Sequence, residues 1–262
     1  MRAVRERLAV PERLAVPERL RRRIGSWGEL LLPTSCLGCG GVGVGRGHAP
    51  VCPRCRTRLA PLAGPFCPRC QSPSGPDGAS CRLCADWPDV LVWCRSATRF
   101  DGPASSLVRA LKYEGWSRVG PALVSPMVRA LREGGIPPVD WIVPVPTTPG
   151  RLKERGFNPA RRLAEGLGEA LGIPVVDALG RPAEAPRQVG LPPSQRAANV
   201  RGAFIVERVV SDSLQPPQVL LVDDVLTTGA TVAAAAESLS RAGMAWVGVL
   251  TFARAAPGAP GS

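Results

Sequence analysis

Two adjacent carboxylates, Asp223 and Asp224, follow the apolar run 219–222 and precede a turn of small residues. The apolar run predicts a buried strand, and open α/β sheets bind ligands at the carboxyl ends of such strands. The turn leads into a predicted helix, whose backbone N–H groups and dipole favour a phosphate. Carboxylates repel a phosphate, but they accept hydrogen bonds from hydroxyl groups. A ribose 5-phosphate offers both groups, so we expect its phosphate in the turn and its hydroxyls at the acids.

Two other interpretations of the acid pair stay open at this point. Both side chains could be solvated acids at the end of a buried strand, without a ligand. They could also belong to a nucleotidase-type metal strand. That type of site is accompanied by a Gly-x-x-x-x-Gly-Lys-Ser/Thr loop, which the sequence lacks.

Eight of the nine cysteines form four Cys-x-x-Cys pairs. The pairs are Cys36 with Cys39, Cys52 with Cys55, Cys67 with Cys70, and Cys81 with Cys84. Two such pairs complete a tetrahedral shell of four thiolates for Zn²⁺, and a closed shell of this kind is structural. Disulfides are an alternative that a reducing compartment disfavours, and an iron–sulfur cluster usually has other spacings. The spacing leaves open which pairs share a metal ion.

The net charge of +12 is carried almost entirely by arginine. Because arginine binds phosphate in a bidentate manner, we expect phosphorylated metabolites or nucleic acid as partners, with scattered solvated arginines as the alternative. No stretch approaches the roughly 18 apolar residues of a membrane span, and arginines interrupt the N-terminal region. We therefore expect a cytoplasmic protein without a membrane span or signal peptide.

From about Val90 onward, predicted strands and helices alternate and would position these groups. Strands are predicted at 90–97, 141–145, 173–176, 203–206, 219–222 and 246–252, and helices at 103–112, 119–133, 159–171 and 230–242. Asn158 and Pro159 are typical of a helix start, and Gly172 is typical of its end. This alternation predicts an α/β domain with a mainly parallel sheet covered on both faces.

The stretch VLLVDDVLTTGAT at 219–231 closely resembles the phosphoribosyl diphosphate (PRPP) motif of type I phosphoribosyltransferases. ALKYEG at 110–115, PVPTTPGRLKERGFN at 144–158, QRAANVRGAF at 195–204 and the cysteine pairs resemble the ComF family, which includes GntX-like members. The resemblance implies a zinc-ribbon module joined to a type I phosphoribosyltransferase fold. The chain would then comprise a basic arm (1–32), a zinc-ribbon module (33–89), a phosphoribosyltransferase-like domain (90–254) and a loose tail (255–262).

The resemblance also implies a function and a set of site residues. The protein would bind PRPP with Mg²⁺ and transfer or hydrolyse its phosphoribosyl group, with an unidentified acceptor. The implied PRPP-binding residues are Asp223, Asp224, Thr227, Thr228, Gly229, Ala230, Thr231, Thr147, Arg151 and Arg155. Asp223, Asp224 and Arg187 would be catalytic, and Gln188 and Arg196 would lie with Arg187 on a mobile hood.

The ComF branch is associated with handling DNA during natural transformation, which adds a second hypothesis. Members commonly carry threonine three residues before the glutamine aligned with Gln188, where this chain has Ala185. The alternative is therefore a non-catalytic adaptor of the competence machinery that binds a ribose phosphate or single-stranded DNA beside other DNA-uptake proteins. Aromatic residues are only 5%, so an array for stacking bases is not evident.

Overall fold

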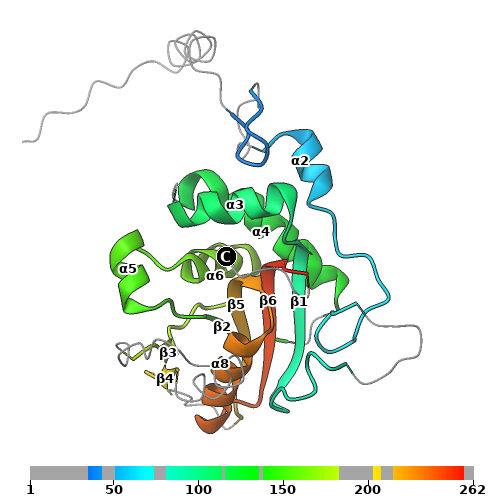
Figure 1. Cartoon of the computed structure of the whole chain (residues 1–262). Coiled ribbons are helices and arrows are strands. Elements are labelled where there is room, and N and C mark those ends of the chain that lie inside the picture. The colour runs from blue at the N-terminus through cyan, green and yellow to red at the C-terminus, as the bar shows by residue number, and fades with distance from the viewer. Residues whose placement is uncertain are drawn as a thin grey trace, which may run out of the picture.

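A four-stranded parallel sheet forms the centre of the protein (Figure 1). The computed structural model describes residues 35–42, 51–73, 81–113, 116–135, 138–182, 203–207 and 215–256. The strand order is β1 (Leu91–Arg99), β6 (Trp246–Arg254), β5 (Gln218–Leu226) and β2 (Trp141–Pro144). Each neighbouring pair is parallel, which confirms the predicted parallel α/β architecture.

Helices cover both faces of this sheet, as the alternation of elements predicts. They are α3 (Gly102–Tyr113), α4 (Trp116–Glu133), α6 (Pro159–Leu171) and α8 (Ala230–Arg241). Successive side chains of a strand point to opposite faces, so Leu220 and Val222 of β5 enter the core beneath α3, α4 and α6. Val219 and Leu221 enter the other core, which α8 covers. Among the described helices, none is long and apolar enough to cross a membrane.

The start and end of α6 follow from the residues that predict them. The Asn158 side-chain oxygen accepts a hydrogen bond from the Ala160 N–H at 3.1 Å, and Pro159 occupies the first helical position. Gly172 ends the helix in the left-handed conformation, with φ 71°. The predicted capping signals are therefore confirmed at this helix.

Three predicted strands differ most in length from the observed ones. The predicted strand 173–176 forms only a bridge between Val175 and Ile142, because Pro174 has no N–H to donate to β2. The strand predicted at 203–206 is reduced to β4 (Ile205–Val206), which pairs antiparallel with β3 (Leu179–Gly180). By contrast, β5 continues past Val222 to Leu226 because β6 continues beside it.

Two short helices were not expected from the sequence. One is α2 (Pro53–Arg58), which starts directly after Cys52. The other is α5 (Pro149–Arg155), which lies inside the segment 144–158, where the sequence predicted no helix. The Thr148 hydroxyl accepts a hydrogen bond from the Arg151 N–H and so caps α5. Gly156 ends this helix in the left-handed conformation.

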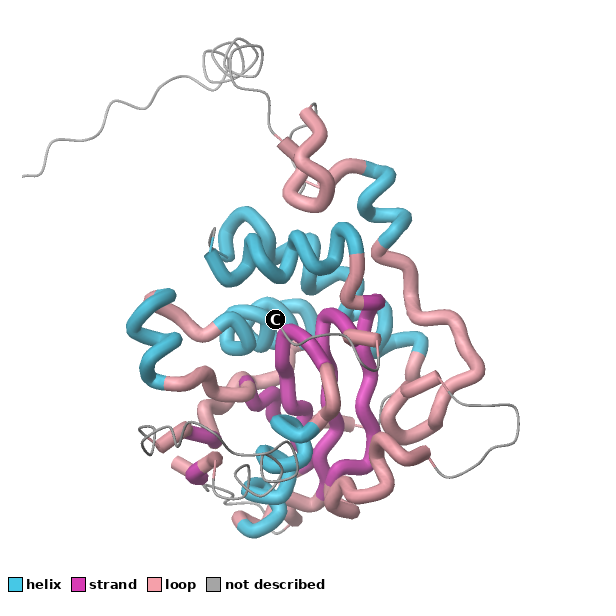
Figure 2. The backbone as a smooth tube through the Cα atoms, viewed as in Figure 1, coloured by secondary structure: helices cyan, strands magenta, loops and turns pink. Residues whose placement is uncertain are grey.

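The two halves of the cysteine-rich region pack against opposite faces of the sheet. This region consists mostly of loops (Figure 2). Cys36 and Cys55 belong to the core shared with α3 and α4. Cys67 and Cys84 belong to the core that α8 covers. Each half therefore extends a different hydrophobic core of the α/β domain.

Candidate functional site

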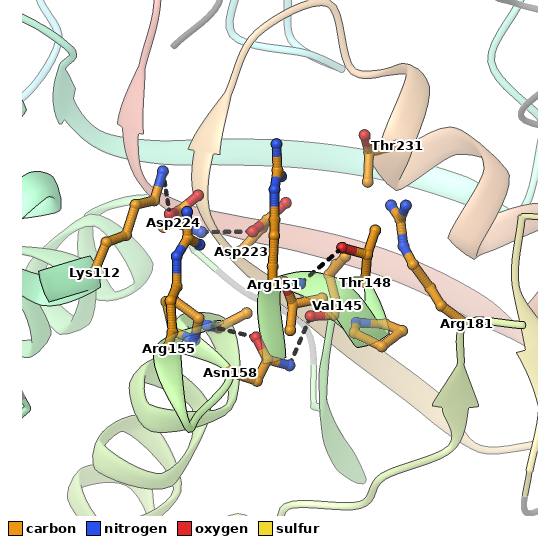
Figure 3. A pocket seen from close by; sticks show the side chains of 14 residues that line it. Lys112, Val145, Thr148, Arg151, Arg155, Asn158, Arg181, Asp223, Asp224 and Thr231 are labelled. Atoms are coloured by element: carbon orange, nitrogen blue, oxygen red, sulfur yellow. Dashed lines mark hydrogen bonds and ion pairs between the residues drawn. The ribbon is translucent and has the colours of Figure 1, made fainter. Parts of the chain in front are cut away.

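A pocket opens at the carboxyl ends of β2 and β5 (Figure 3). Pairing between these strands ends at Pro144 and Val222, and one further hydrogen bond joins the Val145 N–H to the Val222 carbonyl. Beyond that point β5 pairs only with β6, so its other edge faces the pocket. The cavity has a volume of about 140 Å³. Its lining residues are Lys112, Val145, Pro146, Thr147, Thr148, Arg151, Arg155, Asn158, Pro159, Ala160, Arg181, Asp223, Asp224 and Thr231.

The acid pair lies within β5, although the sequence predicted it just after the strand. Alternation along the strand places the two side chains on opposite faces of the sheet, and both carboxylates still reach the pocket at the free edge of β5. Asp224 points toward α3, where Lys112 Nζ lies 3.0 Å from its Oδ2. Asp223 Oδ1 accepts a hydrogen bond of 2.8 Å from the Asp224 N–H. Figure 3 shows both carboxylates directed into the pocket.

The Asp223 carboxyl has an unusual protonation equilibrium. Burial and the neighbouring charge of Asp224 raise its pKa to about 8. The Asp224 N–H, Lys112 and Arg181 oppose this rise, but they do not cancel it. The Asp223 carboxyl therefore binds a proton more tightly than an ordinary aspartate does.

Cations surround the acids and outnumber them in the pocket lining. Arg151, Arg155, Arg181 and Lys112 line the cavity. Burial lowers the pKa of Arg181, an effect that Asp223 opposes and Arg151 reinforces. The Nε atoms of Arg155 and Arg181 are buried without a hydrogen-bond partner in the described part of the chain. Because positive groups exceed negative ones, the pocket favours an anionic ligand.

Aromatic rings hold two of these arginines in place. The Arg181 guanidinium lies over the Phe204 ring, with Cζ 4.7 Å from the ring centroid. The Arg155 guanidinium lies over Tyr113 at 5.5 Å. Contacts of this kind restrict a long side chain without neutralising its charge.

The turn after β5 leads into the N-terminus of α8. Gly229 precedes the helix with φ 83°, and the Thr228 hydroxyl accepts a hydrogen bond from the Ala230 N–H. The first turn of α8 contains no acidic residue. The first N–H groups of a helix have no acceptor within it, so this end can bind an anion.

The structure brings together six of the residues that the sequence assigned to PRPP. Asp223, Asp224, Thr231, Thr147, Arg151 and Arg155 all line the pocket. Thr227, Thr228, Gly229 and Ala230 lie in the adjoining turn and are not part of the lining. Arg187, Gln188 and Arg196, together with Ala185, lie outside the described residues.

Sequence reasoning missed Lys112, Arg181 and the second role of Asn158. Lys112 lies in the ALKYEG stretch, so that motif was the available signal. Asn158 was expected to cap a helix, and it also donates from Nδ2 to the Val145 carbonyl at 3.0 Å. This bond ties the end of β2 to the start of α6. Arg181 follows the two-residue strand β3, and no local pattern marks it.

The cysteines form two separate clusters of four thiols. Cys36, Cys39, Cys52 and Cys55 form the first, and Cys67, Cys70, Cys81 and Cys84 form the second. Within each cluster the four sulfurs lie within 4.8 Å of one another. Consecutive pairs therefore share a site, which the spacing alone had left open.

The geometry of these clusters fits tetrahedral zinc. Sulfurs bound to one Zn²⁺ at about 2.3 Å lie about 3.8 Å apart. The Sγ atoms of Cys67 and Cys84 are 3.7 Å apart, and those of Cys39 and Cys52 are 3.9 Å apart. Burial disfavours the Cys36 thiolate, but N–H groups including that of Cys52 outweigh it and lower the pKa to about 6. Both clusters accordingly have the geometry of structural zinc sites.

Comparisons with known proteins identify the family. Residues 27–85 match the double zinc ribbon domain model. DNA utilization protein YhgH of Salmonella typhi is 33% identical over 187 residues, covering 70% of this chain and 81% of that protein. Competence protein F of Haemophilus influenzae is 29% identical over 158 residues, covering 58% and 69%.

A solved purine phosphoribosyltransferase from Pyrococcus horikoshii is 24% identical, covering 54% of this chain and 77% of that one. Its TM-score of 0.31 is too low to bear on function. The identity and coverage of the YhgH match, with the double zinc ribbon, show that this chain belongs to the ComF family.

Proposed function

We propose that this protein binds PRPP with Mg²⁺ in the pocket beside β5 and transfers or hydrolyses the phosphoribosyl group. The observation that carries the proposal is that one cavity holds an acid pair, a helix N-terminal residue and several cations. PRPP presents the complementary groups, which are two ribose hydroxyls, a 5′-phosphate and a diphosphate. The zinc-ribbon module would end near residue 89, and the phosphoribosyltransferase-like domain that holds the pocket would extend from there to residue 254.

Each part of the ligand has a counterpart in the described residues. The 5′-phosphate would occupy the turn 227–231, where helix N–H groups are free of intrahelical acceptors. The ribose hydroxyls would bind Asp223 and Asp224. A protonated Asp223 can donate to a hydroxyl oxygen and an ionised one can accept from it, so this residue suits a sugar in either state.

The diphosphate would lie against α5. Arg151 and Arg155 extend from that helix into the pocket, and Thr147 adds a hydroxyl at its edge. Displacement at the anomeric carbon develops negative charge on the departing diphosphate, and guanidinium groups stabilise such charge. Arg181 also lines the pocket, and Figure 3 labels it with Thr231 among the lining side chains. Its positive charge would attract either phosphate group.

Magnesium would be held mainly by the ligand. Within the described part of the chain, the groups of three or more potential ligand side chains are the two cysteine clusters. The two aspartates of the pocket can supplement phosphate and water oxygens, which Mg²⁺ prefers. When bound, the ion would neutralise charge on the diphosphate and so assist its departure.

The names of the relatives support a role in DNA uptake. The matched proteins are called DNA utilization protein and Competence protein F. A phosphoribosyl activity in that process would act on a base or nucleotide derived from DNA, or on water. In the non-catalytic alternative, the protein binds the ligand but catalyses no reaction. Ala185, which stands in place of the common threonine, favours this alternative.

Isothermal titration calorimetry with PRPP, with and without Mg²⁺, tests the binding step. We expect Mg²⁺-dependent binding to the wild type and none to the variant Asp223→Asn/Asp224→Asn. Asp101→Asn is the matched control, because Asp101 is an exposed acid paired with Arg99 outside the pocket lining. Absence of PRPP binding to the wild type would overturn the proposal. Diphosphate release measured with a panel of bases then separates the enzyme from the non-catalytic alternative.

A further inference from the structure

The indole ring of Trp87 covers the turn at the N-terminus of α8. A Cβ atom placed on Gly229 would collide with this ring, with Cε2 only 2.9 Å away. Gly229 also has φ 83°, a conformation that other residues rarely adopt. Trp87 is 7% exposed and belongs to the same core as Leu226 and Val232, which flank the turn. The ring and the turn are therefore packed directly against each other.

The second zinc ribbon holds Trp87 in this position. The backbone N–H of Trp87 donates to the carbonyl of Cys84, a member of the second cysteine cluster, at 3.2 Å. Arg69, between Cys67 and Cys70, donates from its guanidinium to four carbonyl groups. These belong to Cys84 at 3.0 Å, Trp87 at 3.2 Å, Pro88 at 2.7 Å and Leu91 at 3.0 Å.

The same ribbon is also fixed to the sheet. The Cys94 N–H of β1 donates to the Arg69 carbonyl at 2.7 Å. The Ser96 N–H donates to the Gln71 side chain at 2.7 Å. Arg254 of β6 donates to the Cys70 carbonyl at 2.6 Å. Trp87 is thus part of a rigid connection between the second cysteine cluster, two strands and the turn.

The first ribbon makes its contacts elsewhere. Gly38 packs against Pro103 at the start of α3, and Arg58 lies against Gly102. Arg129 of α4 donates to the Leu59 carbonyl at 2.9 Å. These contacts lie on the face of the sheet opposite α8. Of the two ribbons, the second is the one whose described residues pack on the turn.

We propose that the second zinc ribbon positions the phosphate-binding turn through Trp87, so that ligand affinity depends on this ribbon. Trp87 is a positioning residue, because it acts through the backbone of Gly229. That the ligand is PRPP rests on the proposed function, whereas the role of Trp87 in ordering the turn does not. Removing the ring would leave space beside Gly229, and the loosened turn would have to be ordered again when a phosphate binds.

The variant Trp87→Ala tests this proposal, with Trp93→Ala as its matched control. Trp93 covers Gly248 in the same manner as Trp87 covers Gly229, but Gly248 lies within β6 and not in the turn before α8. Hydrogen–deuterium exchange of the amides of residues 227–232 is the first measurement. We expect exchange to become about tenfold faster in Trp87→Ala, a change that local unfolding of the turn would produce, and to stay unchanged in Trp93→Ala.

Calorimetry with PRPP and zinc analysis complete the experiment. We expect PRPP affinity to fall about tenfold in Trp87→Ala, with two zinc ions retained, and to recover partly in Trp87→Phe. Exchange in the turn of Trp87→Ala that equals that of the wild type would overturn the inference. Wild-type protein that binds no PRPP, but whose turn exchanges faster after Trp87→Ala, would overturn the proposed ligand and leave the positioning role intact.

Discussion

Lys112 Nζ lies 3.0 Å from Oδ2 of Asp224, and this ion pair joins α3 to the acid pair on β5. The side chains of Lys112 and Asp224 are only 19% and 14% exposed. Water therefore screens the pair weakly, and the loss of either charge would leave the other buried without a partner. The pair also keeps Lys112 at the pocket, where its charge can attract an anionic ligand.

Replacement of Lys112 by methionine should destabilise the protein by about 3 kcal/mol, because it leaves the Asp224 carboxylate mostly buried without its partner. The additional change Asp224→Asn should restore part of that loss, because no charge then remains to be solvated. Urea unfolding of the wild type, both single variants and the double variant measures this coupling. If the effects of the two substitutions on the free energy of unfolding are strictly additive, the ion pair contributes nothing to stability.

Asp223 should make the free energy of unfolding depend on pH. Its pKa is raised to about 8 by burial and by Asp224, well above the ordinary aspartate value of 3.8. The folded state therefore binds a proton more tightly than the unfolded state, so stability is lost as pH rises from about 4 through about 8. Asp223→Asn removes this loss. Its melting temperature should exceed that of the wild type by a few degrees at pH 9 and by less at pH 5.

Calorimetric melting of both proteins at several pH values checks this expectation. The difference between them should grow with pH up to about 8 and then level off, as the pKa of Asp223 requires. A difference that is the same at pH 5 and pH 9 would contradict the raised pKa.

Local patterns predicted the elements whose signals lie close together in the sequence. The capped helix α6 and the acid pair beside a helix start follow from short motifs around Asn158 and Asp223. The cysteine pairs likewise predicted zinc ribbons, which the double zinc ribbon match supports. Which pairs share a site depends on how the chain folds back, so the spacing could not settle it.

Long-range contacts explain what the sequence left out. Lys112 precedes Asp224 by over one hundred residues, and Arg181 enters the pocket after β3. The length of β5 depended on its neighbour β6, which no pattern around Val222 describes. Basic residues and prolines dominate the segment 144–158, and they mask the helix start that Thr148 caps.

The protein should contain two zinc ions per chain, one in each cysteine cluster. Removal of zinc by a chelator should unfold the cysteine-rich region, because the four thiolates of each cluster would lose the metal ion that joins them. Elemental analysis of the purified protein measures the metal content directly. Iron in place of zinc, or protein without metal that melts at the same temperature, would contradict this assignment.

Single-stranded DNA should bind with an affinity that falls as salt concentration rises. Arg54, Arg56 and Arg58 of α2 are exposed, whereas Arg69 is tied to backbone carbonyls and is not available to a partner. A phosphate contact to single-stranded DNA contributes about 0.7 to the slope of log affinity against log salt concentration. The variant Arg54→Ala/Arg58→Ala should therefore bind more weakly, with a slope reduced by about 1.4.

Fluorescence anisotropy with labelled oligonucleotides of several sequences measures both quantities. Arg161→Ala/Arg162→Ala is the matched control, since it removes the same charge from α6, where both arginines are paired with Glu165. If α2 contacts the phosphates, the first variant should lose affinity equally for all sequences, because phosphate contacts do not read bases. Equal losses in the two variants would mean that only net charge matters. Absence of binding at low salt would exclude a direct DNA contact and leave the PRPP pocket as the proposed site of function.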